Sequence, residues 1–255
     1  MLYPSSEIRI HLRALGIQPS DTIFVHGDAA IAAQYIYTNG ADPVIGFFCE
    51  VKSYLSEGTI LVPSFTYSAT KGERFDVQKT PSDIGLFSEK FRMLDGVQRS
   101  LHPVFSICAL GKYADKFVHS RLDDCFGEGT IFDQIYSSNV KILTMGCAFE
   151  RVTLAHYVEQ RLKVSYRYFK NFSAEITNLG KSTQLDVRYY VRNLEFDTEL
   201  DLSKLEHNAL TRSLIRREHF GRLLARAILA KDFFDIANEL ILDDEYSLIK
   251  GRPLV

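Results

Sequence analysis

The chain has 255 residues, of which 46% are hydrophobic, enough to bury the core of one large domain. A total of 30 lysines and arginines against 32 acidic residues gives a formal charge of −2, which excludes the strongly basic surface typical of nucleic-acid-binding proteins. No stretch approaches the roughly 18 apolar residues of a membrane span, and the four cysteines form no CxxC pair, so we expect a cytoplasmic protein without a membrane segment, disulfide framework or zinc knuckle.

Helices and strands alternate through the first two thirds of the chain. The patterns predict, in order, a helix at 5–16, a strand at 22–28, a helix at 42–58, a strand at 59–65, a polar loop at 66–82, a helix at 82–94, a strand at 103–111, a helix at 130–138, a strand at 139–146 and a helix at 152–163. This alternation favours an α/β fold with a central, mostly parallel sheet flanked by helices. The long loop is a candidate functional segment, since such loops in compact domains often carry function.

The pattern changes after residue 165. Residues 174–193 predict two strands around a Gly180-Lys181 turn, followed by helices near 201–210, 218–230 and 231–241. We therefore expect one domain over 1–255, with an α/β part at 1–165 that binds ligand and holds the catalytic groups. Residues 166–255 would add a C-terminal α+β portion, a hairpin and helices packed on the same sheet.

The segment TLAHYVEQR carries the most informative spacing. Thr153, His156 and Glu159 are three residues apart, so on a helix they share one face. A carboxylate beside an imidazole fixes its tautomer and supports the imidazolium that forms on proton uptake, which is what a general base needs. The alternative is an exposed His–Glu pair with little energetic effect.

Polar residues also follow the predicted strands. His26 ends the strand FVHGD, where ligand sites of open α/β sheets gather, although a buried histidine bonded to a backbone carbonyl is the alternative. Residues 63–68 offer hydroxyls after the next strand, and 99–106 combine an arginine with hydroxyls that could hold a phosphate or amides. The segment FGEGT resembles a phosphate-binding turn in composition, but it matches neither the Walker A nor the dinucleotide motif.

A covalent mechanism is the rival chemistry. Cys147 ends the strand NVKILTMG near the His156 helix, so a Cys–His acyl-enzyme is conceivable. The small neighbours Gly146 and Ala148 favour instead a small residue packed at a crowded turn. No HExxH, GxSxG or paired-carboxylate motif is present.

Five segments, in order, resemble the aminoglycoside 3-N-acetyltransferase family, also called the antibiotic N-acetyltransferase family. They span most of the chain and read FVHGD, GTILVPSFTYS, RSLHPVFSICALG, FGEGTIFDQI, and KILTMG followed by TLAHYVEQ. The resemblance implies an acetyl-CoA-dependent N-acyltransferase that needs no metal, with a fold distinct from that of the common acetyltransferase superfamily.

The resemblance also implies roles for single residues. His156 would be the general base, Glu159 its orienting partner, and Thr153 a contact of the thioester. In the turn that follows the first strand, Gly27 and Asp28 replace hydroxyl residues of the family, so Asp28, together with Glu128, is expected to bind the substrate. The residues expected to bind coenzyme A are His26, Gly27, Pro63, Ser64, Thr66, Tyr67, Arg99, Ser100, His102 and Ser106.

The C-terminal part suggests the acceptor. SYRYFKNFSAEI and RYYVRNL are similar to a branch of the family associated with bacterial surface-polysaccharide biosynthesis, and residues 166–170 and 188–192 supply basic and aromatic side chains that suit a nucleotide diphosphate sugar. We therefore predict direct acetylation of a nucleotide-linked amino sugar, as in lipopolysaccharide or O-antigen synthesis. The alternatives are an aminoglycoside 3-N-acetyltransferase that confers resistance, a Cys147 acyl-enzyme, and a non-catalytic binding protein. A homo-oligomer is left open.

Overall fold

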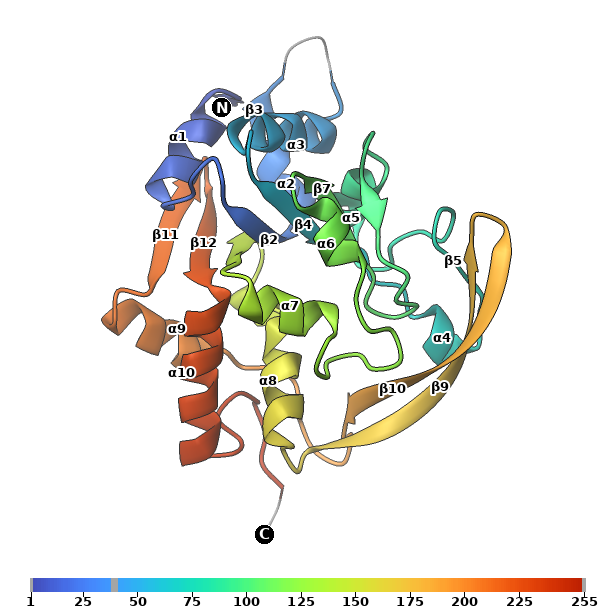
Figure 1. Ribbon diagram of the computed structural model, residues 1–255. Helices are drawn as coiled ribbons and strands as arrows, with labels where there is room; N and C mark the ends of the chain where they lie inside the picture. The colour runs from blue at the N-terminus through green and yellow to red at the C-terminus, as the bar shows by residue number, and fades with distance from the viewer. Residues whose placement is uncertain (1, 38–40, 254–255) are drawn as a thin grey trace.

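The computed structural model describes residues 2–37 and 41–253, and its centre is a seven-stranded sheet. The strands of this sheet are β2 (Thr22–Gly27), β4 (Thr59–Pro63), β6 (Gln98–Arg99), β7 (Ile107–Gly111), β8 (Lys141–Met145), β11 (Ile215–Phe220) and β12 (Leu223–Leu229). Their order across the sheet is β11-β12-β8-β2-β4-β7-β6. Helices cover both faces of the sheet (Figure 1), which confirms the predicted α/β class with a central sheet flanked by helices.

The expectation of a mostly parallel sheet needs correction. In this sheet, as far as the structure describes it, the two parallel pairs are those of β2, with β4 on one side and β8 on the other. The outer pairs, β4 with β7, β6 with β7, β8 with β12 and β11 with β12, are antiparallel. Both edges of the sheet are built from hairpins, β6–β7 and β11–β12, and strands joined by a short turn must run antiparallel.

Each central strand supplies side chains to two cores. In β2, Ile23 and Val25 face one side of the sheet and Phe24 faces the other, as the period of a strand requires. One side packs against α1 (Glu7–Ala14), α2 (Ala29–Ala32), α3 (Pro43–Tyr54) and α5 (Leu86–Arg92). The other packs against α6 (Ala114–Val118), α7 (Ile131–Ser137), α8 (Leu154–Leu162), α9 (Ser203–Thr211) and α10 (Ala230–Asp243).

Local signals explain where several helices begin and end. At α3, Asp42 accepts from the backbone N–H groups of Val44 and Ile45 at 3.0 and 3.3 Å, and Pro43 occupies the first turn. The last turn of α8 ends at Lys163, which adopts a left-handed conformation with φ 55°. The Asp42-Pro43 start can be read from the sequence, whereas the left-handed conformation of Lys163 cannot, since glycine or asparagine is the usual signal there.

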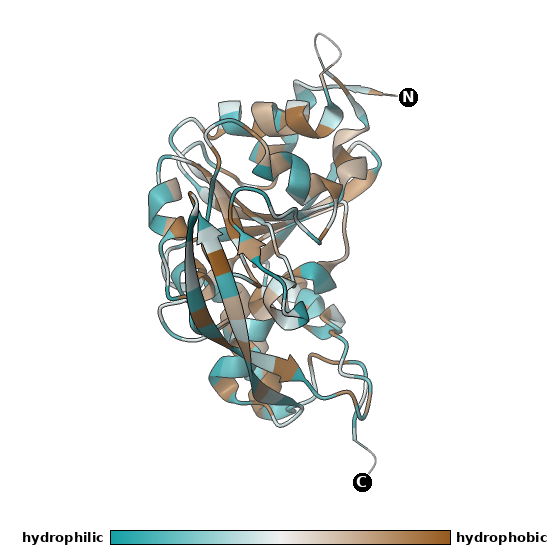
Figure 2. Cartoon of the chain, turned by 90° about the vertical axis from the view of Figure 1, so that its right-hand side faces the viewer, coloured by the Kyte–Doolittle hydropathy of each residue, from teal (hydrophilic) through white to brown (hydrophobic). Residues whose placement is uncertain are grey.

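A long hairpin forms a second, three-stranded sheet. The strands of the hairpin are β9 (Arg167–Asn178) and β10 (Lys181–Arg192). The third strand is β5 (Phe75–Asp76), which pairs with β9. Both β5 and the short helix α4 (Ser68–Lys71) belong to the segment 66–82, the predicted loop. Leu179 and Gly180 at the tip both have positive φ, 49° and 78°, as the tight turn of a twisted hairpin requires. Figure 2 shows hydrophilic and hydrophobic residues following one another along the hairpin.

The predicted helix at 218–230 is wrong, because β11 and β12 occupy that region. The turn between them contains Gly221 with φ 61°, and burial follows the sheet, with Phe220, Ala225 and Ala227 inside. A short apolar run such as LLARAIL fits a strand or a helix equally well, and pairing with β8 decides for the strand. The predicted strand at 103–111 is also shorter, since only Ile107–Gly111 pairs.

A pair of short strands near the N-terminus and a short helical turn just before α8 complete the described elements. The strands β1 (Tyr3–Pro4) and β3 (Tyr35–Ile36) pair in parallel, and a single 3₁₀ turn spans Phe149–Arg151. Within the described ranges, no helix combines the length and the apolar composition that crossing a membrane would require.

Candidate active site

The carboxyl ends of the three parallel strands meet at one edge of the sheet, beside a cavity of about 630 Å³. We call this the first cavity. It is lined by seven of the residues that the sequence predicts for the site, His26, Gly27, Asp28, Pro63, Tyr67, Thr153 and His156. They come from the ends of β2 and β4 and from the start of α8.

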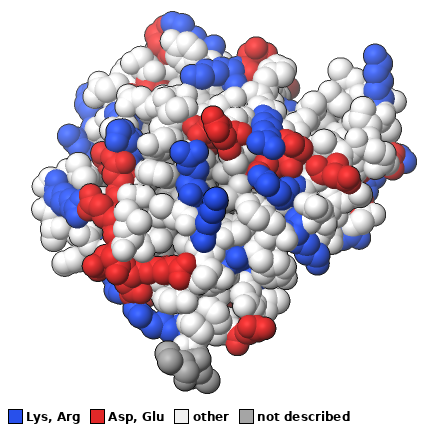
Figure 3. Space-filling model, turned by 60° about the horizontal axis from the view of Figure 1, so that its bottom comes forward, with Lys and Arg blue, Asp and Glu red and all other residues white. Residues whose placement is uncertain are grey.

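A second cavity of about 620 Å³ lies next to the first. Glu150, Arg151, His156 and Tyr189 line both cavities, so His156 lies where the two meet. The charged residues that line only the second cavity are Arg167, Arg192, Glu199, Asp201 and Lys250. Acidic and basic side chains are similarly mixed over the lower face of the molecule (Figure 3), which carries no field of a single sign.

His156 and Glu159 are bonded to each other as the helical spacing predicts. His156 Nδ1 lies 2.7 Å from Glu159 Oε2. The Glu159 side chain is fully buried, whereas 21% of the His156 side chain is exposed. Since a carboxylate only accepts, Nδ1 carries the proton and donates it to Glu159, which leaves the lone pair of Nε2 free.

Arg167 at the start of β9 completes a buried cluster. Its Nε lies 2.8 Å from Glu159 Oε2, its Nη2 lies 3.0 Å from His156 Nδ1, and its Nη1 donates to the Tyr190 carbonyl at 3.3 Å. The side chain is only 4% exposed. Arg167 could not be assigned a role in catalysis from the sequence, because 11 residues and a change of element separate it from His156.

The cluster keeps its two acid–base groups in opposite charge states. Burial and the nearby Arg167 guanidinium lower the pKa of His156, against the opposing effect of Glu159. Burial would raise the pKa of Glu159, but Arg167 and His156 outweigh it and lower that pKa. Near neutral pH the site therefore holds a neutral imidazole beside a carboxylate, which is the resting state of a general base.

The turn after β2 is tightly packed. His26 is buried against the Phe24 ring, and burial lowers its pKa to about 3, so it stays neutral near pH 7 and cannot exchange protons there. A Cβ on Gly27 would come within 2.5 Å of the Phe87 ring, so only glycine fits. Asp28 uses Oδ1 to accept from Ala30 N–H at 2.8 Å and cap α2 while it lines the first cavity.

Thr153 and Cys147 complete the wall nearest to His156. Thr153 immediately precedes α8, lines the first cavity, and donates its hydroxyl to the Arg151 carbonyl at 3.4 Å. Cys147 also lines this cavity; its Sγ lies 3.4 Å from the His26 carbonyl, and burial raises the pKa of the thiol. A thiol held in its protonated form is a poor nucleophile.

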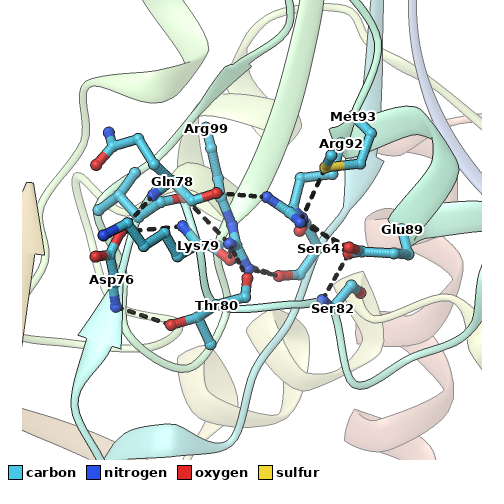
Figure 4. A network of polar contacts seen from close by, with 12 residues as sticks. Ser64, Asp76, Gln78, Lys79, Thr80, Ser82, Glu89, Arg92, Met93 and Arg99 are labelled. Atoms are coloured by element: carbon cyan, nitrogen blue, oxygen red, sulfur yellow. Dashed lines mark hydrogen bonds and ion pairs between the residues drawn. The ribbon is translucent and has the colours of Figure 1, made fainter.

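Four residues expected to contact coenzyme A line neither cavity: Arg99, Ser100, His102 and Ser106. Of the segment 99–106, only Phe105 lines the first cavity. Arg99 donates to the carbonyls of Ser64, Val77 and Thr80, at 2.8, 3.2 and 2.6 Å, and to the Ser106 hydroxyl at 3.1 Å (Figure 4). These hydrogen bonds connect the 66–82 segment to the end of β4. All three nitrogens of the guanidinium already donate to protein groups and are not available to a phosphate.

The other polar side chains of these segments are interior as well. His102 accepts from Phe105 N–H at 2.9 Å through Nδ1, and its Nε2 donates to the Asp124 carbonyl at 3.2 Å. Four more are buried, or bonded to backbone inside the protein, or both: Ser64, Thr66, Ser100 and Ser106. Glu128 is exposed and lines neither cavity, so the structure does not bring it together with His156, and its contact with the substrate stays a prediction. A sequence pattern of hydroxyls cannot show that they point inward.

We expect Arg99→Met to destabilise the fold without weakening acetyl-CoA binding. Three buried carbonyls would lose their donor, which costs about 2–4 kcal/mol of unfolding free energy. Urea unfolding and calorimetric titration with acetyl-CoA measure the two effects, and Arg121→Met, which removes an exposed arginine paired with Asp123, is the control. A folded Arg99→Met protein with tenfold weaker binding would restore the predicted contact with coenzyme A.

The described residues hold no group of three or more histidine, cysteine, aspartate or glutamate side chains arranged to bind a metal. The acid–base groups of the site are the neutral His156, the buried carboxylate of Glu159 and the arginine behind them.

Proteins of one family are similar to this chain in sequence and structure. A model described as aminoglycoside 3-N-acetyltransferase matches residues 38–241. The chain is 26% identical over 212 residues, 74% of each chain, to the SPbeta prophage-derived aminoglycoside N(3′)-acetyltransferase-like protein YokD of Bacillus subtilis (strain 168). It is 25% identical over 232 residues, 89% of this chain and 83% of the relative, to aminoglycoside N(3)-acetyltransferase IV of Salmonella sp.

Solved structures share the fold. The apoenzyme of aminoglycoside acetyltransferase AAC(3)-IVa aligns with a TM-score of 0.79 at 22% identity, over 98% of this chain and 93% of its own. The binary complex of AAC-IIIb with CoASH aligns with a TM-score of 0.80 at 19% identity, over 99% and 100%.

These similarities overturn the predicted acceptor. Every named relative is an aminoglycoside acetyltransferase or a protein described as like one, so the nucleotide-linked amino sugar of surface-polysaccharide biosynthesis is wrong, and the resemblance to that branch is unsupported. Two of the basic side chains that suggested a nucleotide are paired with carboxylates. Arg167 is buried against Glu159, and Arg188 Nη2 lies 2.5 Å from Asp124 Oδ2.

Proposed function

We propose, because the chain belongs to the aminoglycoside 3-N-acetyltransferase family, that it transfers the acetyl group of acetyl-CoA to an amine of an aminoglycoside. The predicted enzyme class, an acetyl-CoA-dependent N-acetyltransferase, is confirmed by the family. One observation carries the choice of site. A neutral, carboxylate-bound histidine lies where two cavities of about 630 and 620 Å³ meet, as a direct transfer between two bound substrates requires.

The first cavity is the proposed site of acetyl-CoA. Four of the residues expected to bind coenzyme A line it, His26, Gly27, Pro63 and Tyr67, and Thr153 stands between them and His156 in the role expected for the thioester contact. The second cavity then takes the aminoglycoside. Glu150 and Asp201 are carboxylates that suit the ammonium groups of such a molecule.

The proposed reaction has a single transfer step. The amine nitrogen of the acceptor attacks the thioester carbonyl carbon, so that a C–N bond forms, the C–S bond breaks and coenzyme A leaves as the thiolate. The proton that the nitrogen loses passes to Nε2 of His156. Glu159, bonded to Nδ1 at 2.7 Å, stabilises the imidazolium that results.

Thiol release from acetyl-CoA tests this proposal. The purified chain is assayed with a panel that includes apramycin and sisomicin, which relatives of this fold bind in solved structures. We expect release with at least one aminoglycoside and none without an acceptor. The absence of release with every aminoglycoside, from a protein that binds acetyl-CoA by calorimetry, would contradict the proposal and favour the non-catalytic alternative.

Cys147→Ser is expected to keep kcat/KM within about threefold of the original protein, because direct transfer needs no thiolate. The substitution preserves size and a donor for the His26 carbonyl. Steady-state thiol release measures the rate, and intact-protein mass spectrometry after mixing with acetyl-CoA shows whether an acetyl group is attached to the protein. A loss of more than a hundredfold, or an acetylated Cys147, would establish the covalent route instead.

The predicted cytoplasmic location is also part of the proposal, because cytoplasmic acetyl-CoA would supply the donor. It stays a prediction, as do the catalytic and binding roles given to single residues above.

A further inference from the structure

The geometry points to Arg167 as a positioning residue of this active site, which holds Glu159 as a carboxylate and so fixes the proton of His156 on Nδ1. The inference rests on the proposed role of His156 as the base. It goes beyond that role because it assigns the state of the base to a side chain from another element, the start of the β9–β10 hairpin.

The contacts of Arg167 are made with three different nitrogens. Nε meets Glu159 Oε2 at 2.8 Å, Nη2 meets His156 Nδ1 at 3.0 Å, and Nη1 donates to the Tyr190 carbonyl at 3.3 Å. The rigid plane of a guanidinium therefore fixes the distance between α8 and the hairpin. At 4% exposure the side chain is held in one place by protein alone.

These distances decide the tautomer. His156 Nδ1 lies beside an acceptor, Glu159 Oε2, and a donor-only group, the Arg167 guanidinium, and it can bond to only one of them. If Nδ1 accepted from Arg167, its lone pair would face the carboxylate oxygen at 2.7 Å, which is repulsive. Donation to Glu159 is favoured as long as Glu159 is ionised, and the buried guanidinium is what favours that ionised form.

The same arginine opposes protonation of the ring at rest. A cation 3.0 Å from Nδ1 disfavours the imidazolium, so the base remains neutral until a proton arrives from the acceptor. The other groups that face this cluster are Arg192 in the second cavity, the Tyr166 side chain near Glu159, and the Phe126 ring, whose centroid lies 5.5 Å from that of His156. Of these only Arg192 is charged near neutral pH, and it acts on His156 in the same direction as Arg167.

The test is a pH titration of histidine rings by nitrogen-15 NMR on the full chain labelled at histidine. The His156 signals are identified by their loss in His156→Gln. In the original protein we expect a neutral ring with its proton on Nδ1 across pH 6–8. In Arg167→Met the titration midpoint of His156 should move to higher pH, since the opposing cation is gone and Glu159 remains. This readout needs no acceptor, so it stands even if aminoglycosides are not the substrates.

Activity gives the second arm. Arg167→Met should lower kcat on the order of 10², because the imidazole loses its fixed position, and should move the acidic limb of the kcat/KM profile to higher pH. Arg99→Met is the matched control, an interior arginine with three backbone acceptors that touches neither cavity. Arg99→Met should lower the free energy of unfolding, while the titration midpoint of His156 and the acidic limb of the kcat/KM profile remain at the same pH.

Arg167→Lys covers the case in which Arg167→Met does not fold. A lysine keeps the charge but cannot reach three partners at once, so we expect the midpoint to stay close to the original value while kcat falls. If Arg167→Met or Arg167→Lys loses stability but leaves the tautomer, the midpoint and kcat unchanged, Arg167 is only a structural residue and the inference is overturned.

Discussion

Replacing His156 by alanine is expected to lower turnover by roughly 10²–10⁴ while acetyl-CoA still binds with nearly unchanged affinity. The imidazole is the one titratable group at the junction of the two cavities that is neutral, partly exposed and bonded to a buried carboxylate. Without it, the amine must lose its proton to water. The walls of the first cavity at His26, Gly27 and Pro63 are untouched by the change.

Stopped-flow thiol release and calorimetric titration with acetyl-CoA separate these two quantities. His156→Gln is the conservative comparison, since its amide can still meet Glu159 but cannot take up a proton. His119→Ala removes an exposed histidine, 73% of whose side chain contacts solvent, and should leave turnover unchanged. Full turnover in His156→Ala would exclude His156 as the general base, and another group would then have to accept the proton.

Mild acid is expected to unfold this protein well before its carboxylates titrate. Burial lowers the pKa of His26 to about 3 and that of His102 to about 4, from 6.5 in the unfolded chain, and His156 shifts in the same direction. Below pH 6.5 the unfolded state therefore binds protons that the folded state does not. The contribution of these histidines to the free energy of unfolding is therefore fully present above pH 6.5. It is lost progressively as the pH decreases from 6.5 towards the pKa values of the folded state.

The size of this effect follows from the number of histidines. His26 and His102 each contribute up to about 1.4 kcal/mol per pH unit, so the two together approach about 3 kcal/mol per unit in that range, and His156 adds to the loss in the same direction. For a domain of ordinary stability, about 5–15 kcal/mol, a decrease from pH 7 to pH 5 is then a large fraction of the whole. The pKa values of Asp124 and Glu159 are lowered despite burial, by Arg188 and Arg167 among others, so the loss of their contribution begins only at lower pH.

Urea unfolding at half-unit steps between pH 7.5 and pH 5 measures the slope. His26→Phe should reduce it by up to about half, because a phenyl ring beside Phe24 fills the same apolar space and takes up no proton. His119→Gln, which changes an exposed histidine, should leave it unchanged. A flat free energy of unfolding over this interval would show that these imidazoles take up protons equally in the folded and unfolded states, which would contradict the prediction.

Much of the fold and the centre of the site could be predicted from the sequence because the signals are local. Asp42 and Pro43 mark the start of a helix, and three-residue spacing puts His156 and Glu159 on one face. The resemblance of the five segments added the family and the donor, both of which stood when known proteins were compared.

Most of the misses are decided by tertiary contacts. Residues 223–229 form a strand because they pair with β8. Arg99 connects segments inside the protein because it donates hydrogen bonds to three backbone carbonyls. Nothing in the sequence indicated that Arg167 lies behind the base, since its partners lie on a helix that precedes it. The expected acceptor was overturned by the comparison with known proteins, and two of the basic residues that suggested a nucleotide, Arg167 and Arg188, are paired with buried carboxylates.

The β9–β10 hairpin also has a consequence for how the enzyme acquires its activity during synthesis. Its first strand pairs Ile176 with Phe75, about a hundred positions earlier, and its first residue supplies the arginine behind Glu159. Contacts between residues so far apart in the sequence form slowly, because the entropy of closing a long loop is lost before the contacts contribute any stabilisation. A nascent chain synthesised only as far as α8 contains the base and its carboxylate. The complete active site can form only after both strands of the hairpin have been synthesised.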